Sequence, residues 1–426
     1  MESLLRVATA GSVDDGKSTL VGRLLHDAKA VFADQLAAVE HASRRRGYDE
    51  ADLALLVDGL RAEREQGITI DVAYRYFATP RRTFVLADTP GHIQYTRNMV
   101  TGASTADVAI VLVDARKGLV EQSRRHATIA ALLRVRHVVL AVNKMDLVGF
   151  AEEVFDEILA DFAALAERRS VRSWSAVPIS ALLGDNVVDR SAATPWYAGP
   201  PLLEHLETLD IQENRELPAE DAAGEAAAED EVRFPVQLVI RPRRHGYADF
   251  RGYAGRVEAG TLRPGTPVTV LPSGQASTVA AIDTADGPLA EAGAGRSVVV
   301  RLADDVDVSR GDLLVAGRPP SVTRELAVTV CWLAEEPLRP GGRYRIRHTT
   351  REVRAVVEPR TRLDVSTSDS APTDTLALND IGQVLLRTAE PLVVDPYSRH
   401  RATGALLIVD ETSGATVAAG MVEGAR

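Results

Sequence analysis

Cysteine is nearly absent from this sequence, since Cys331 is the only one among 426 residues. One thiol cannot form a disulfide within the chain, which excludes a disulfide-bonded scaffold and is typical of a reducing compartment. Cys331 stands beside Val330 and Trp332 in an apolar stretch. We therefore expect a small buried core residue rather than a reactive nucleophile.

Long hydrophobic runs are missing as well. The longest apolar stretch, residues 108–113, has the length of a buried strand, whereas a helix that crosses a bilayer needs about 20 apolar residues. The first residues do not show the basic segment and apolar core of a secretion signal. We expect a cytoplasmic protein that does not enter a membrane.

Positive charge is in deficit, because 49 lysine and arginine residues face 60 aspartate and glutamate residues, for a formal net charge of -11. Such a balance disfavours binding to a phosphate backbone, so we expect no nucleic-acid partner. Hydrophobic residues at 45% and charged residues at 26% are ordinary for folded domains. The length allows two to four domains.

The first half of the chain alternates short strands with segments of helical periodicity. In residues 17–26, Leu20, Val21, Leu24 and Leu25 recur at helical spacing. The strands are continuous in hydrophobicity, as expected when helices cover both faces of a parallel sheet. We predict an α/β domain with a mostly parallel sheet at residues 1–211. Its strands are expected at residues 5–10, 83–87, 108–113, 138–142 and 176–179.

The second half has a different pattern. Residues 212–231 are rich in alanine, aspartate and glutamate without apolar periodicity, which predicts a linker. Residues 232–320 and 321–426 then hold short strands, such as 236–240 and 267–271, between turns with glycine and proline. Closely spaced strands with such turns favour closed β structures. We predict two β-barrel domains.

A glycine-rich loop directly follows the first strand and opens the first helix. Gly11 and Gly16 allow backbone N–H groups to turn toward phosphate oxygens, and the helix N-terminus adds positive potential. Lys17 would place its charge on the β- and γ-phosphates, and the Ser18 hydroxyl would bind Mg²⁺. The predicted phosphate-binding residues are Gly11, Ser12, Val13, Asp14, Asp15, Gly16, Lys17, Ser18 and Thr19.

A second polar segment, Asp88-Thr89-Pro90-Gly91-His92, ends the strand at residues 83–87. Asp88 is placed to hold the metal through a water. Gly91 allows the backbone to approach a γ-phosphate closely, so this loop can sense whether that phosphate is present. A histidine after a turn is more often structural than catalytic. Beside the first loop, however, we expect His92 to position the attacking water.

Two further loops follow the strands at 138–142 and 176–179. They are Asn143-Lys144-Met145-Asp146 and Ser180-Ala181-Leu182. The Asp146 carboxylate can accept hydrogen bonds from the N1–H and exocyclic amine of guanine, which adenine does not offer. Asn143 and the Ala181 N–H would address N7 and O6, and the Lys144 stem would cover the ring. The predicted nucleotide is GTP.

Residues 64–71 (REQGITID) lie between the first two motifs, where a segment that orders around the γ-phosphate is needed. Thr69 would supply its hydroxyl to Mg²⁺ and its N–H to the phosphate. We therefore predict Lys17, Thr69 and His92 as catalytic residues. The predicted metal site is Ser18, Thr69 and Asp88, with Asp88 acting through a water.

The order of these motifs resembles the translation-factor class of GTPases, and a nucleotide domain followed by two barrels is similar to the layout of elongation factor Tu. Longer segments across nearly the whole chain, barrels included, are similar to the large, GTPase subunit of bacterial sulfate adenylyltransferase. They are residues 52–77 (DLALLVDGLRAEREQGITIDVAYRYF), 92–106 (HIQYTRNMVTGASTA), 196–206 (WYAGPPLLEHL), 233–236 (RFPV), 249–255 (DFRGYAG) and 401–410 (RATGALLIVD).

The resemblance implies a heterodimer. In that family a separate small subunit carries the ATP and sulfate chemistry that forms adenosine 5′-phosphosulfate and pyrophosphate in sulfate assimilation. GTP hydrolysis on the large subunit is coupled to this unfavourable nucleotidyl transfer. That sulfate is the substrate is inferred from this resemblance alone. Some relatives carry a Gly-rich kinase motif in a fused adenylylsulfate kinase domain; the sequence lacks it, so we expect an unfused chain.

The sequence departs from the family at Ile93, where relatives usually have an acidic residue beside the water-positioning histidine. Residues 243–248 and the predicted linker also look longer than usual, which leaves contacts with the partner open. Two other interpretations remain. One is a translation-factor-like GTPase that delivers an aminoacyl-tRNA, and the other is a free-standing regulatory GTPase.

Overall fold

The computed structural model describes residues 3–29, 37, 39, 41, 43, 53–56, 71–171, 173–210, 231–242, 250–367 and 369–425. The chain divides into two units, which are described separately. The α/β unit is residues 1–215 with 365–369, and the β unit is residues 216–364 with 370–426. Across the described ranges, every helix is too short or too polar to cross a membrane.

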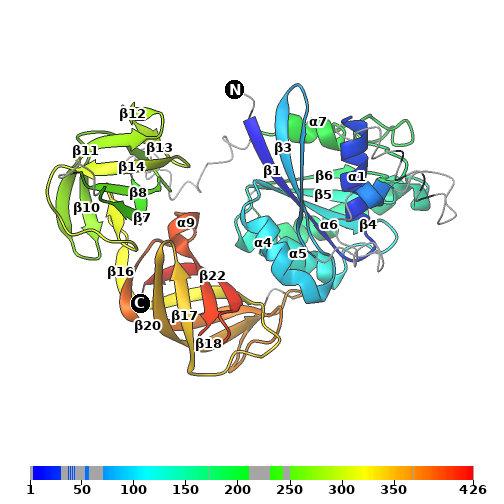
Figure 1. Cartoon of the computed structure of the whole chain (residues 1–426). Coiled ribbons are helices and arrows are strands. Elements are labelled where there is room, and N and C mark those ends of the chain that lie inside the picture. The colour runs from blue at the N-terminus through cyan, green and yellow to red at the C-terminus, as the bar shows by residue number, and fades with distance from the viewer. Residues whose placement is uncertain are drawn as a thin grey trace. The chain divides into compact units, whose positions relative to one another are not determined.

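A six-stranded sheet forms the centre of the α/β unit, in the order β2-β3-β1-β4-β5-β6 (Figure 1). Neighbouring strands from β3 to β6 run parallel. The sequence therefore predicted a mostly parallel sheet correctly. The five parallel strands are β1 (Ser3–Gly11), β3 (Arg82–Asp88), β4 (Val108–Asp114), β5 (His137–Asn143) and β6 (Trp174–Pro178).

Burial explains which strands the sequence reveals. All seven residues of β4 and of β5 are buried, so these strands read as continuous apolar runs. The edge strand β2 (Ala73–Ala78) runs antiparallel to β3 and alternates exposed positions with more buried ones, of which only Phe77 is fully buried, and Tyr76 is 71% exposed. This half-exposed pattern is a weaker signal, so the strand was not among those predicted from the sequence.

Helices cover both faces of the sheet, with α1 and α7 on one side and α4 and α5 on the other (Figure 1). The predicted helix at 17–26 is confirmed as α1, one residue longer, and its apolar face packs in the sheet core. The helices are α1 (Lys17–Asp27), α4 (Thr96–Ser104), α5 (Glu121–Leu132), α6 (Glu152–Arg168) and α7 (Leu202–Thr208), with short turns η1 (Leu53–Leu56), η2 (Ile93–Tyr95) and η3 (Met145–Val148).

The β unit begins with a closed barrel, because the sheet order β10-β15-β7-β8-β14-β11 is completed by pairing of β10 with β11. Closure removes the exposed strand edges. This first barrel consists of β7 (Arg233–Ile240), β8 (Gly252–Arg256), β10 (Pro267–Leu271), β11 (Gln275–Thr284), β14 (Ser297–Leu302) and β15 (Leu313–Val315), with the short strands β9 (Thr261–Leu262), β12 (Gly287–Leu289) and β13 (Ala292–Gly293).

A second barrel follows, in the order β17-β21-β22-β16-β20-β18, and pairing of β17 with β18 closes it. Cys331 lies in this barrel at 4% exposure, as expected for a core residue. The strands are β16 (Ser321–Trp332), β17 (Gly342–His348), β18 (Arg351–Leu363), β20 (Ile381–Val394), β21 (Ala405–Asp410) and β22 (Thr416–Ala425), with β19 (Ser370–Pro372) and the short helix α9 (Arg401–Gly404).

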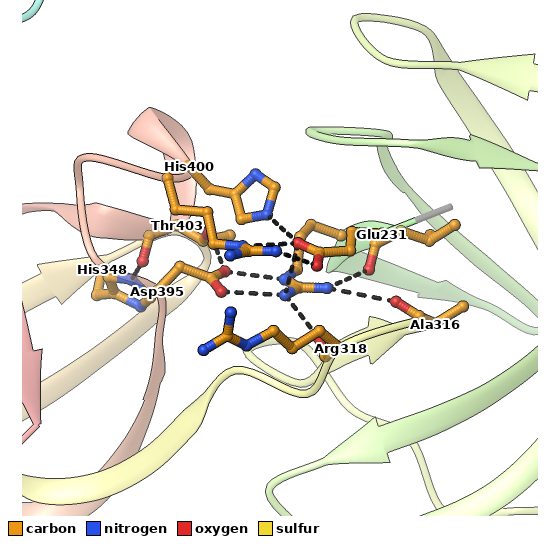
Figure 2. A network of polar contacts seen from close by, with 10 residues as sticks. Glu231, Ala316, Arg318, His348, Asp395, His400 and Thr403 are labelled. Carbon is orange, nitrogen blue, oxygen red and sulfur yellow. Dashed lines mark hydrogen bonds and ion pairs between the residues drawn. The ribbon is translucent and has the colours of Figure 1, made fainter. Parts of the chain in front are cut away.

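A buried network of charged groups joins the two barrels (Figure 2). Arg233 of the first barrel is fully buried and donates two hydrogen bonds to Asp395 of the second, at 2.8 and 3.0 Å. Thr403 donates to the same carboxylate at 2.6 Å. Glu231, the last residue of the predicted linker at 212–231, is buried here and accepts hydrogen bonds from Arg399 and, at 2.9 Å, from His400. Such burial is tolerated because every charge has an opposite partner.

Candidate nucleotide-binding site

The loop between β1 and α1 is shaped by two glycines with positive φ, Gly11 at 146° and Gly16 at 92°. A Cβ at Gly11 would lie 2.7 Å from the carbonyl oxygen of Leu112, and one at Gly16 would lie 2.5 Å from Nδ2 of Asn143. Side chains therefore do not fit at either position. The loop ends at Lys17, where α1 begins, so the positive end of the helix faces the loop.

Lys17 is held inside this loop. Its side chain is 7% exposed, and Nζ donates hydrogen bonds to the carbonyl oxygens of Gly11 at 3.1 Å and Ser12 at 2.7 Å. Burial lowers the pKa of Lys17, while the neighbouring carboxylates of Asp88 and Asp15 oppose this shift. The ammonium group is thus fixed inside the loop by two backbone carbonyls.

Asp15 stabilises the turn of the loop, because its carboxylate accepts a hydrogen bond from the Ser12 N–H at 2.6 Å. Burial raises the pKa of Asp15, with the Ser12 hydrogen bond and Lys17 acting in the opposite direction. Asp14 adopts a positive φ of 66° beside it. These contacts fix the backbone conformation of the loop.

The predicted metal ligands Ser18 and Asp88 lie in contact. Ser18 Oγ donates to Asp88 Oδ2 at 2.9 Å, and Thr9 Oγ1 donates to Asp88 Oδ1 at 2.8 Å. Asp88 is fully buried. A hydroxyl and a carboxylate are oxygen ligands of the kind that Mg²⁺ prefers, so the residues fit this ion. Thr9, which fixes the carboxylate, was not found from the sequence, since it lies within the first strand.

The loop after β3 approaches the first loop closely. A Cβ at Gly91 would lie 2.3 Å from Lys17 Nζ and 2.8 Å from the Ser12 carbonyl oxygen, so only glycine fits. His92 follows, half-buried, and among the described residues its Nδ1 atom has no hydrogen-bond partner. Its ring lies edge-on to Tyr95, with 6.1 Å between the ring centroids. Thr69 and residues 57–70 lie outside the described residues.

Asn143 joins three loops. Its Nδ2 donates to the Asp15 carbonyl oxygen at 2.7 Å, and its Oδ1 accepts from the Ala181 N–H at 2.9 Å. Both Asn143 and the Ala181 N–H were expected to contact the base, whereas the structure pairs them with each other. The structure thereby brings together the phosphate loop and both predicted base loops at the carboxyl ends of β1, β5 and β6.

Lys144 links the loop after β5 to the end of β4 and to the loop after β1, because its ammonium lies 3.0 Å from Asp114 Oδ2 and also donates to the Asp14 carbonyl oxygen. Arg116 binds the same carboxylate through Nε at 3.0 Å and Nη2 at 2.6 Å. Burial alone would raise the pKa of Asp114, but hydrogen bonds from Arg116 and Lys144 outweigh it and hold this pKa well below its usual range. Asp146 lies half-buried on η3 beside them.

Two further residues support the site and were not found from the sequence. His126 of α5 is fully buried, and its Nδ1 accepts a hydrogen bond from the Gly11 N–H at 2.9 Å. Arg23 of α1 donates through Nε to the carbonyl oxygen of Ala181 at 3.2 Å and also bonds that of Leu182. Each pair is more than a hundred residues apart in the chain, so no local pattern indicates the contact.

All predicted site residues other than Thr69 are therefore described, and they lie at the carboxyl ends of the central strands, on adjoining loops and on the first turns of the helices that follow. This is the architecture of a P-loop GTPase. The family model for the elongation factor Tu GTP binding domain matches residues 2–212, and the GTP-eEF1A C-terminal domain-like model matches residues 325–423. The chain is thus a GTPase of the translation-factor class, as its motifs predicted.

Closer relatives define the particular family. The chain is 56% identical over 426 residues to the bifunctional enzyme CysN/CysC of Mycobacterium tuberculosis, covering 99% of the chain and 67% of that relative. It is 50% identical to sulfate adenylyltransferase subunit 1 of Citrobacter koseri, in a match that covers 99% of the chain and 86% of the relative. It is also 50% identical to the protein of the same name from Aeromonas salmonicida, in a match that covers 99% of the chain and 87% of that relative. The chain belongs to the sulfate adenylyltransferase subunit 1 family.

Proposed function

We propose that this chain is the GTP-hydrolysing subunit of a heteromeric sulfate adenylyltransferase. It would couple GTP hydrolysis to the reaction of ATP with sulfate, which yields adenosine 5′-phosphosulfate and pyrophosphate. The observation that carries the proposal is 50% identity to sulfate adenylyltransferase subunit 1 over 99% of the chain. The relatives' names give no support to the aminoacyl-tRNA interpretation.

The triphosphate is bound by the loop after β1. Backbone N–H groups of residues 12–18 and the Lys17 ammonium, already close to the loop carbonyls, neutralise phosphate oxygens. Ser18, Asp88 and Thr69 would hold Mg²⁺, with Asp88 acting through a water. When bound, this ion neutralises charge that develops on the β- and γ-phosphates.

The base and the water are held by separate loops. Asp146 accepts hydrogen bonds from the N1–H and amine of guanine, and the Lys144 stem, fixed by Asp114, covers the ring. His92 orients the attacking water. Its Nδ1 is buried and has no hydrogen-bond partner among the described residues.

The name "subunit 1" implies a second chain. We propose that this partner is a small subunit that binds ATP and sulfate. The test mixes the purified chain with the small subunit, ATP and sulfate, and measures pyrophosphate release with and without GTP. We expect GTP to raise the release several-fold, and a Lys17→Ala variant, which binds nucleotide weakly, to remove the increase. Release that is independent of GTP contradicts the proposal.

A further inference from the structure

The loop after β4, residues 114–118 (DARKG), is a polar segment that belongs to none of the four predicted motifs. Strand β4 lies between β1 and β5 in the sheet, so this loop emerges between the phosphate loop and the base loop that carries Asp146. Asp114, the last residue of β4, pairs in register with Asn143, the last residue of β5. A further polar loop thus lies beside both parts of the nucleotide site.

The Asp114 carboxylate, which is fully buried, holds two cations at once. Its Oδ1 accepts hydrogen bonds from the backbone N–H and Nε of Arg116, both at 3.0 Å, and its Oδ2 accepts one from Nη2 at 2.6 Å. The Lys144 ammonium lies 3.0 Å from the same Oδ2. Because both oxygens are occupied, the carboxylate is fixed in one orientation, and its burial is tolerated since two positive charges compensate it.

Lys144 has a backbone conformation that needs such support. Its φ of 64° lies in the left-handed region, which residues with a side chain seldom adopt and which persists only where contacts hold it. Its ammonium bonds the Asp114 carboxylate and the Asp14 carbonyl oxygen, and of these two acceptors only the carboxylate carries a charge. The stem of Lys144 is therefore held by Asp114 at the end remote from the backbone.

Arg116 extends the effect to the carboxylate that reads the base. Its side chain is 47% exposed, but the fork on Asp114 fixes the guanidinium. The pKa of Arg116 is raised by its hydrogen bond to Asp114, by the charge of Asp114 and, to a smaller extent, by the charge of Asp146. Asp146 is thus attracted by a cation whose position Asp114 sets.

We propose that Asp114 is a positioning residue for guanine recognition. It holds the Lys144 stem against the base, and through Arg116 it orients the Asp146 carboxylate toward the N1–H and amine of guanine. Asp114 itself does not touch the nucleotide. The inference rests on the proposed function, because it concerns the base of the GTP that the chain binds.

The phosphate loop has supports of its own. His126 accepts a hydrogen bond from the Gly11 N–H, and Asp15 accepts one from the Ser12 N–H. Loss of the Asp114 charge should therefore weaken binding of the base and leave binding of the phosphates unchanged. This difference separates a positioning role at the base from a general structural role, which would weaken both.

Affinities of the full chain for GDP, inosine diphosphate and inorganic tripolyphosphate test this role. Asp114→Asn keeps the shape of the side chain and removes its charge, so it should weaken GDP binding about tenfold or more and leave tripolyphosphate binding within about twofold of wild type. Arg116→Met should lower the preference for GDP over inosine diphosphate by a few fold, because hypoxanthine lacks the amine that donates to Asp146. Arg116→Lys should restore part of this preference.

Arg301→Met is the matched control, since Arg301 is 41% exposed and bound to Asp283 at 2.7 Å in the first barrel, and it should leave all three affinities unchanged. A second comparison asks whether Asp114 acts through Lys144. In a Lys144→Met background, Asp114→Asn should add little to the loss of GDP affinity, because residues that act as a unit are not additive.

Any one of three results overturns the positioning role: wild-type GDP affinity in Asp114→Asn, an equal loss of tripolyphosphate binding, or an unchanged base preference in Arg116→Met. The exposed Arg116 variants keep the test independent of any effect of Asp114 on folding. A wild-type chain that binds no guanine nucleotide overturns the proposed function together with the positioning role.

Discussion

At the residue scale, the choice of base depends on a single carboxylate, Asp146. Asp146→Asn replaces one acceptor oxygen by an amide donor, which opposes the N1–H and amine of guanine but complements the carbonyl at the same position of xanthine. We expect the preference for GTP over xanthosine triphosphate to fall by about 100-fold or more. Competition binding measures the change. If selectivity stays as in wild type, Asp146 does not contact the base.

His92 is expected to act on the water rather than on the bound nucleotide. His92→Ala should therefore lower kcat by about 100-fold or more and leave the affinity for GTP within a few fold. Single-turnover hydrolysis and equilibrium binding separate the two effects. A parallel loss of affinity and rate would instead identify a structural histidine.

His126 gives the α/β unit a pH dependence. Burial lowers the pKa of its imidazole to about 3, and the positive charges of Lys17 and Arg125 add to the effect. The ring therefore stays neutral in the folded chain, whereas in the unfolded chain it titrates with a pKa of about 6.5. Between these values only the unfolded chain takes up the proton. The free energy of unfolding should thus fall by a few kcal/mol as the pH drops from about 6.5 toward 3.

The control for this prediction is His126→Asn, whose Oδ1 can accept the Gly11 hydrogen bond at the position of Nδ1 but does not titrate. Urea unfolding at several pH values should show a shallower loss of stability on acidification for the variant. An identical pH slope in the two proteins would exclude His126 as the titrating group.

At the scale of secondary-structure elements, α1 is tied to the loop after β6. Ala181 is held from both sides, through its N–H by Asn143 and through its carbonyl by Arg23. Arg23→Met keeps the length of the side chain and removes the donors, so the base loop should loosen. We expect GDP to dissociate about tenfold faster, as measured with a fluorescent analogue. Arg23→Lys, which keeps one donor, should lie between the two, and an unchanged rate would show that the loop does not need this contact.

The same elements show what a sequence can reveal. The buried parallel strands and α1 were predicted because each has a local signal, either a continuous apolar run or helical spacing. The edge strand β2 was missed because its successive side chains alternate between exposed and more buried positions, which leaves no continuous apolar run. The loops carrying Gly11 and Gly91 were found because their conformations exclude side chains. Arg23, Asp114 and His126 were not, since their roles arise from contacts between distant segments.

At the scale of the whole molecule, the barrels were predicted from their short strands and turns, but their junction was not. Arg233 and Asp395 are 162 residues apart, and each alone resembles an ordinary surface charge. Burial alone would raise the pKa of Asp395, but the hydrogen bonds from Arg233 and Thr403 outweigh it and hold this pKa below its usual value. The carboxylate therefore stays ionised opposite the buried guanidinium.

Replacing one partner of the Arg233–Asp395 pair should lower the stability of the protein more than replacing both. Asp395→Asn leaves the buried Arg233 guanidinium with only the more distant Glu231 carboxylate, at 3.9 Å, as a counter-charge, which should cost about 3 kcal/mol of stability in urea unfolding. The double variant Arg233→Met, Asp395→Leu replaces the pair by apolar groups, and it should recover most of that loss, because neither charge of the pair then remains to be desolvated and Glu231 keeps Arg399 and His400 as partners. GTP affinity, a property of the α/β unit, serves as the control and should not change. If the double variant is as unstable as the sum of the single substitutions, the pair contributes through its geometry rather than through the balance of its charges.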